Sequence, residues 1–243
     1  MSLFIWGRLG GPIFLLNFGT LMLKLIILML CFFTTLIQAD SSESKQPVLL
    51  APGYGPLTFE APEAGTYSQP IYGEATNGKV INSAGTPQNL FDLMGDKVVL
   101  LSFIYATCND VNGCPLSTAV FHKIKRRLSK AGLKDDLRLI TLSFNPKHDT
   151  PDVMADYAKS LETEQTDWRF LTTQSQHELQ PILEGYNQSI QLEYDDEGQS
   201  TGTFSHTLRV YLIDTNKKIR KIYSVGFLHP DILINDVKTL TLE

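Results

Sequence analysis

The sequence predicts an α/β fold in which a central mixed sheet is flanked by helices. Short, continuously apolar segments of the kind that form buried strands alternate with longer segments whose apolar residues recur at helical spacing. Proline or capping residues open several of the longer segments, as they do at helix N-termini. Strands that alternate with helices imply a sheet with parallel strands and with helices on its faces.

The predicted elements follow the order β-α-β-α-β-α-β-β-α. The first core strand is expected at 98–105, and Pro115 suits the first turn of the next helix because its missing N–H needs no partner there. That helix is expected to run to about Ala131, where Gly132 ends it. The later elements are a strand at 137–144, a helix from 151 to about 161, a strand at 168–171, a short helix from about 176 to 185, strands at 208–213 and 219–223, and a helix at 230–240.

Two hairpins are expected outside this alternation. Residues 79–85 form a short hairpin before the first core strand, and residues 188–203 form an extra polar hairpin that turns at Asp195-Asp-Glu-Gly198. The second hairpin lies between the predicted helix that ends near residue 185 and the strand at 208–213.

The first 39 residues have the composition of a targeting segment. They hold only two charged side chains, Arg8 and Lys24, and an apolar run at 25–37 precedes Ala39. This pattern predicts a signal peptide cleaved after Ala39, with an uncleaved membrane anchor as the alternative. We therefore expect an exported, periplasmic protein that is either free or attached to the inner membrane.

A second segment, residues 40–75, is rich in proline and glycine and is expected to be an extended arm. Its aromatic side chains, including Tyr54 and Tyr67, suggest that the arm packs on the domain. The domain itself is expected at 76–243. Without residues 1–39 the formal net charge changes from −5 to −7, and an acidic domain of this kind excludes nucleic acid as a partner.

Two cysteines, Cys108 and Cys114, follow the first core strand and precede the helix that Pro115 opens. A strand, a loop with two cysteines and a helix N-terminus form the arrangement of thioredoxin, in which the helix dipole stabilises a thiolate. Five residues separate the cysteines, however, where a catalytic redox pair has two. The pair is consistent with a structural disulfide, with redox exchange, or with two sulfurs placed around a metal.

A third candidate is His206, which lies two residues before the apolar strand at 208–213. In a thioredoxin-like fold this loop faces the cysteine loop, and no proline occupies it here. Two thiolates and one imidazole suit copper, Cu(I) in particular, whereas zinc normally requires a fourth ligand. Asp110 is a further oxygen donor for Cu(II). The other histidines are expected at the surface: His122, His148, His177 and His229.

Four segments together resemble the Sco/SenC family of copper-binding, thioredoxin-like assembly factors. They are the cysteine loop ending in Cys114-Pro115, and residues 144–151, 168–172 and 205–214. The resemblance covers about residues 75–243, and it implies that Cys108, Cys114 and His206 are copper ligands. It also implies a role in the assembly of the binuclear copper centre of cytochrome oxidase. The wider cysteine spacing, and Asn145 where the family usually has aspartate, are departures from the family pattern.

Three functions follow from these predictions. The first is a copper chaperone, rather than an enzyme, that delivers copper to a client such as cytochrome oxidase. The second is a thiol–disulfide reductase that acts on cysteines of a partner's copper site, with Cys108 and Cys114 forming a disulfide when oxidised. The third is an interaction module in which the same disulfide is only structural.

Overall fold

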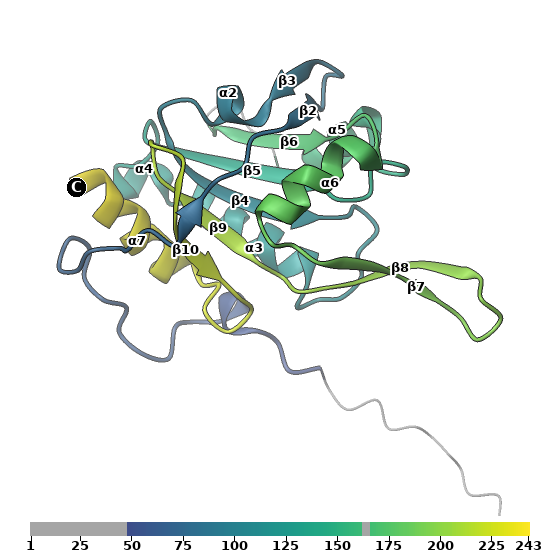
Figure 1. Ribbon diagram of the computed structural model, residues 1–243. Coiled ribbons are helices and arrows are strands. Elements are labelled where there is room, and N and C mark those ends of the chain that lie inside the picture. The colour runs from purple at the N-terminus through teal and green to yellow at the C-terminus, as the bar shows by residue number, and fades with distance from the viewer. Residues whose placement is uncertain (1–47, 162–165) are drawn as a thin grey trace, which may run out of the picture. The chain divides into compact units, whose positions relative to one another are not determined.

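The computed structural model describes residues 48–161 and 166–243, and an eight-stranded sheet forms its centre. The order of strands across the sheet is β1-β10-β9-β4-β5-β6-β2-β3 (Figure 1). The bounds of these strands are β1 (Gly73–Glu74), β2 (Lys79–Asn82), β3 (Pro87–Asn89), β4 (Val98–Ile104), β5 (Leu137–Ser143), β6 (Trp168–Thr172), β9 (Val210–Ile213) and β10 (Lys218–Tyr223). Strands β4, β5 and β6 are parallel, and the other pairs are antiparallel, so the predicted mixed sheet is confirmed.

Helices cover the sheet on both sides, with α3 behind it and α6 in front of it in Figure 1. The predicted helix at 115–131 is two helices, because the chain makes a turn at Arg126 and Arg127. Gly132 ends the second of them with a φ of 74°, as its position predicted. The bounds are η1 (Pro52–Tyr54, a 3₁₀ turn), α2 (Leu90–Met94), α3 (Cys114–Lys125), α4 (Leu128–Ala131), α5 (Pro151–Ala158), α6 (Gln176–Gly185) and α7 (Pro230–Leu242).

Strand β4 is the centre of the core, and all seven of its residues are buried. It pairs in parallel with β5 and antiparallel with β9, in a register that sets Ser102 opposite Val210. Because β9 runs in the opposite direction, the chain that enters β9 lies beside the end of β4. The sheet topology thus brings the segment before Val210 to the loop that follows Ile104.

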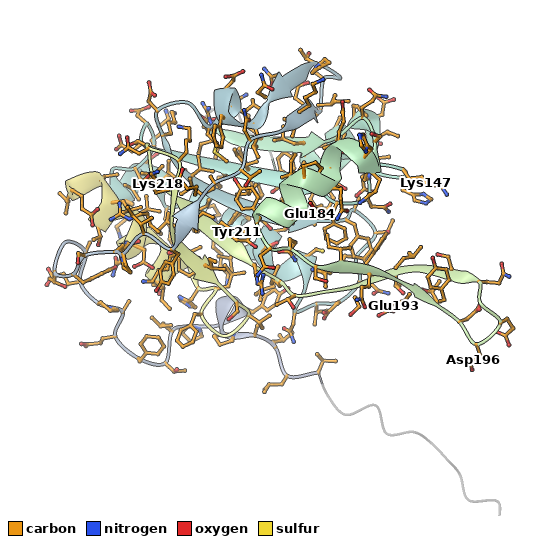
Figure 2. All side chains as sticks on the ribbon, in the orientation of Figure 1. Lys147, Glu184, Glu193, Asp196, Tyr211 and Lys218 are labelled. Carbon is orange, nitrogen blue, oxygen red and sulfur yellow. The ribbon has the colours of Figure 1, made fainter. Side chains whose placement is uncertain are left out.

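A separate two-stranded sheet is formed by β7 (Ile190–Tyr194) and β8 (Ser200–His206). This hairpin extends away from the central sheet, and Glu193 and Asp196 lie on it (Figure 2). The sequence predicted the hairpin but ended it at residue 203, three residues before the strand ends. His206 is therefore the last residue of a strand, and not a residue of the loop before β9.

The N-terminal arm from residue 49 to residue 75 packs on the domain although most of it is irregular. The Tyr67 hydroxyl donates a hydrogen bond of 2.6 Å to the buried carboxylate of Asp236 in α7, and Gln69 Nε2 donates to the backbone oxygen of the same residue at 2.7 Å. The targeting segment predicted at 1–39 lies outside the described residues. No helix within residues 48–161 and 166–243 has the length and apolarity of a membrane span.

Candidate metal centre

The two cysteines lie in the segment that joins β4 to α3, with Cys108 in the middle of the loop and Cys114 at its end. Cys114 is the first residue of α3 and is buried, whereas Cys108 is half-buried. Between them the chain makes a tight turn, in which Gly113 N–H donates to Asp110 O at 2.9 Å and Asn112 N–H donates to Asp110 Oδ1 at 3.0 Å. Both cysteines are free thiols.

His206 reaches the cysteines from the end of β8. Its Nε2 lies 3.7 Å from Cys114 Sγ, and its ring packs edge-on against Phe144, with 4.9 Å between the ring centroids. Tyr105 lies on another side of the imidazole, at 6.3 Å between centroids. These two aromatic rings pack beside the imidazole and limit the orientations that it can take.

The donor atoms of Cys108, Cys114 and His206 all lie within 4.8 Å of one another. A metal ion that bonds to sulfur at about 2.3 Å and to nitrogen at about 2.0 Å fits among atoms with this separation. Two soft sulfurs and one imidazole nitrogen are a donor set that copper prefers. The structure therefore brings together the three residues that the sequence singled out, and the arrangement fits a copper ion.

The pKa values of the two thiols are shifted in opposite directions. The Cys114 thiol donates a hydrogen bond to Cys108, which lowers the pKa of Cys108 to about 4 against the effect of burial, and His206 adds to the lowering. The same hydrogen bond, together with burial, raises the pKa of Cys114 well above its ordinary value. The half-buried Cys108 is thus favoured as the thiolate, and the buried Cys114 thiol must lose its proton before it can bind a metal.

A buried carboxylate, Asp149, supports the cysteine loop from the side of β5. Its Oδ2 accepts a hydrogen bond of 2.9 Å from the backbone N–H of Ala106, two residues before Cys108, and a second one of 2.5 Å from the Ser143 hydroxyl. Burial raises the pKa of Asp149, and the Ser143 and Ala106 hydrogen bonds oppose that rise. The sequence showed Asp149 only as a residue near a helix start, and nothing in its local pattern predicts this contact.

The remaining candidates lie apart from the three donor atoms. Asp110 is exposed, and its Oδ1 accepts the Asn112 N–H within the turn. His148 and His177 are exposed, as predicted. The prediction of a surface position is wrong for His229, which is 2% exposed and caps α7, accepting the Asp231 N–H on Nδ1.

A mixed sheet in which a strand, a cysteine loop and a helix N-terminus follow one another places this chain in the thioredoxin-like class of proteins. Within that class, a family model described as SCO1/SenC matches residues 76–242. This chain belongs to the SCO1/SenC family, and the resemblance stated from the four sequence segments is confirmed.

Individual relatives agree with this assignment. The SCO1 protein homolog of Bacillus subtilis (strain 168) is 28% identical over 159 residues, which cover 65% of this chain and 78% of that protein. A SCO1/SenC family lipoprotein from Bacillus anthracis str. Ames has 25% identity and a TM-score of 0.58, over 71% of this chain and 97% of that one. The copper-bound ScoI of Bradyrhizobium japonicum shares the fold at 22% identity and a TM-score of 0.57, over 69% of this chain and 99% of that one.

Proposed function

We propose that this protein binds copper through Cys108 Sγ, Cys114 Sγ and His206 Nε2 and passes it to a client copper enzyme such as cytochrome oxidase. The observation that carries the proposal is the approach of these three donor atoms to within 4.8 Å of one another. Membership of the SCO1/SenC family supports it. So does a relative of 26% identity, BsSco, which is described as a member of the Sco family of cytochrome c oxidase assembly proteins.

The same proposal covers the chain's organisation. Residues 1–39 direct export and are either cleaved or kept as an anchor, residues 40–75 form the arm, and residues 76–243 form the copper domain. The protein then acts on the outer side of the inner membrane, where the client's copper centre is assembled.

The proposal is tested by titrating the reduced protein with Cu(I) in competition with a chromophoric chelator, and with Cu(II) while sulfur-to-copper charge transfer is recorded. We expect one copper per chain, and binding at least about tenfold weaker in His206→Ala because a ligand is lost. His148→Ala is the matched control, since His148 is an exposed histidine outside the donor set. Negligible copper retention by the wild type, or equal affinity in His206→Ala, would reject the proposal.

A second candidate function is thiol–disulfide reduction, which is favoured because Cys108 has the lower pKa and is less buried than Cys114. The half-buried Cys108 thiolate attacks one sulfur of a partner disulfide, and the partner's other sulfur leaves as a thiolate. The buried Cys114 then attacks the mixed disulfide at Cys108 and releases the partner's second thiolate. The partner gains two electrons, one proton comes from the Cys114 thiol and the second from solvent, and Cys108 and Cys114 become a disulfide. Replacement Cys114→Ser should trap the mixed disulfide with a client, and the absence of any such adduct would exclude this role.

A further inference from the structure

The centre of the cysteine loop is hydrogen-bonded to the N-terminal arm. The Asn112 side chain makes two of these bonds, because Oδ1 accepts from Ala51 N–H at 2.8 Å and Nδ2 donates to Leu49 O at 2.9 Å. The Tyr54 hydroxyl makes a third, to Val111 O at 2.5 Å. Both polar atoms of the Asn112 amide are thus paired with the backbone of a segment that lies outside the residues matched by the family model.

That segment of the arm is itself held firmly against α3. At Gly53 a Cβ atom would lie 2.3 Å from Leu228 O and 2.8 Å from Val120 Cγ2, so only glycine allows this approach. The Lys123 ammonium, two turns along α3 from the cysteine loop, donates to Gly53 O at 2.7 Å and to Tyr54 O at 2.8 Å. The arm is therefore a fixed support, and the hydrogen bonds of Asn112 tie the loop to it.

The spacer at residues 109–113 needs such a support because its own hydrogen bonds fix its shape but not its position. The turn formed with Asp110 is local, and Val111 at its tip is 39% exposed. Cys114 is fixed by α3, and Asp149 holds the start of the loop at Ala106. The spacer between the cysteines has neither of these anchors, and its residues 109–111 are exposed. Surface segments with few buried contacts are the mobile parts of a fold.

We propose that Asn112 is a positioning residue of the copper site, through which the arm holds Cys108 Sγ at metal-binding distance from Cys114 and His206. This inference rests on the proposed function and extends it, because it makes residues 49–54 part of the copper site. A longer loop between the cysteines would otherwise sample positions in which the three donors are too far apart, and copper binding would have to order it.

The test compares full-length variants for Cu(I) affinity, by chelator competition, and for the Cu(II) charge-transfer band. Asn112→Ala removes both amide hydrogen bonds, and we expect binding about tenfold weaker, equivalent to about 1.4 kcal/mol, with a shifted band because the sulfur geometry changes. Tyr54→Phe removes only the bond to Val111 O and should weaken binding about threefold. Asn112→Asp keeps the size and the acceptor but loses the donor to Leu49 O, so we expect an intermediate loss.

Two controls separate positioning from general damage. Asn109→Ala removes an exposed amide from the same spacer and should leave affinity and spectrum unchanged. Tyr67→Phe loosens the arm at its distant contact with Asp236, and it should lower stability without altering copper binding. Affinity and spectrum in Asn112→Ala equal to those of the wild type would overturn the inference, and so would an equal loss in Asn109→Ala.

The remaining outcomes are also decisive. If Asn112→Ala does not fold, Tyr54→Phe decides the matter, because it deletes a single hydroxyl group. If the wild type retains no copper, the proposed function fails on its own, and hydrogen–deuterium exchange of residues 108–114 tests the support separately. Exchange in this segment should be faster in Asn112→Ala than in Asn109→Ala, and equal exchange would overturn the positioning role.

Discussion

The buried carboxylate of Asp149 provides a sharp test of how the cysteine loop is held in place. Asp149 is 1% exposed, and one of its oxygens accepts two hydrogen bonds, from Ala106 N–H and from Ser143 Oγ. Ser143 Oγ in turn accepts the Asn145 N–H at 3.0 Å. Replacement Asp149→Ala leaves the Ser143 hydroxyl, which is fully buried, and the Ala106 N–H without this acceptor.

The size of the effect follows from those two bonds. A hydrogen bond to a charged group contributes about 1.5–3 kcal/mol, and the desolvation that raises the pKa of Asp149 offsets part of the gain. We therefore expect Asp149→Ala to lower the free energy of unfolding by about 2–4 kcal/mol. In Asp149→Asn the amide oxygen can accept both bonds, so a loss of at most about 1 kcal/mol is expected.

Urea and thermal unfolding of the metal-free, reduced protein measure both variants. At about 2–4 °C per kcal/mol for a domain of this size, Asp149→Ala should lower the melting temperature by roughly 4–16 °C. Asp152→Ala, which removes an exposed acid from the first turn of α5, is the control and should lose about 1 kcal/mol or less. An Asp149→Ala variant as stable as the control, or an Asn variant as unstable as the Ala variant, would refute this reasoning.

Other predictions concern pH and the ion pairs. Copper affinity should rise about tenfold per pH unit near neutrality, because the raised pKa of Cys114 means that binding releases its proton; a flat profile in chelator competition would contradict this. Burial raises the pKa of Asp167, but Arg138 and neighbouring cations hold it at about 2. The stabilisation is therefore present above the unfolded-state pKa of about 3.9 and is lost as the pH falls through 2. Asp167→Asn should lower the free energy of unfolding by about 1–2 kcal/mol at pH 7, allowing for solvent screening, and by almost nothing near pH 2. Equal losses in urea unfolding at both pH values would contradict this prediction. Asp236→Ala should lower the free energy of unfolding by about 3–5 kcal/mol in the same assay, because it leaves the hydroxyl of the buried Tyr223 without its acceptor. A loss below 1 kcal/mol would contradict this prediction.

Local signals were enough to predict much of the architecture. The apolar run at 98–105 has no polar face, which is the pattern of a strand buried on both sides, and all seven residues of β4 are buried. Capping residues were expected at the starts of several helices, and two of them make the cap bond: Thr150 accepts the Val153 N–H and Ser175 accepts the Glu178 N–H. These signals are readable because capping and burial depend on residues within one turn or on one strand.

Elements without such local signals were missed. Strand β1 is two residues long and exists only because Gly73 and Glu74 pair with β10. The last three residues of β8 were assigned to a loop, yet Ile190 pairs with His206 across the hairpin. Pairing of this kind depends on a partner strand, and no residue pattern within the segment itself indicates it.

The sequence by itself determined the chemistry of the site: a buried strand that ends in two thiols, a helix that begins at the second thiol, and a histidine before a later strand. The tertiary structure decided which groups meet. Cys114 and His206 are separated by 92 positions and come together because β9 pairs antiparallel with β4. Asn112 and Ala51 are 61 positions apart. A hydrogen bond between a side-chain amide and a distant backbone group produces no periodic sequence pattern from which it could be predicted. Residue type sets what a site can do, but long-range strand pairing and packing set which residues share it.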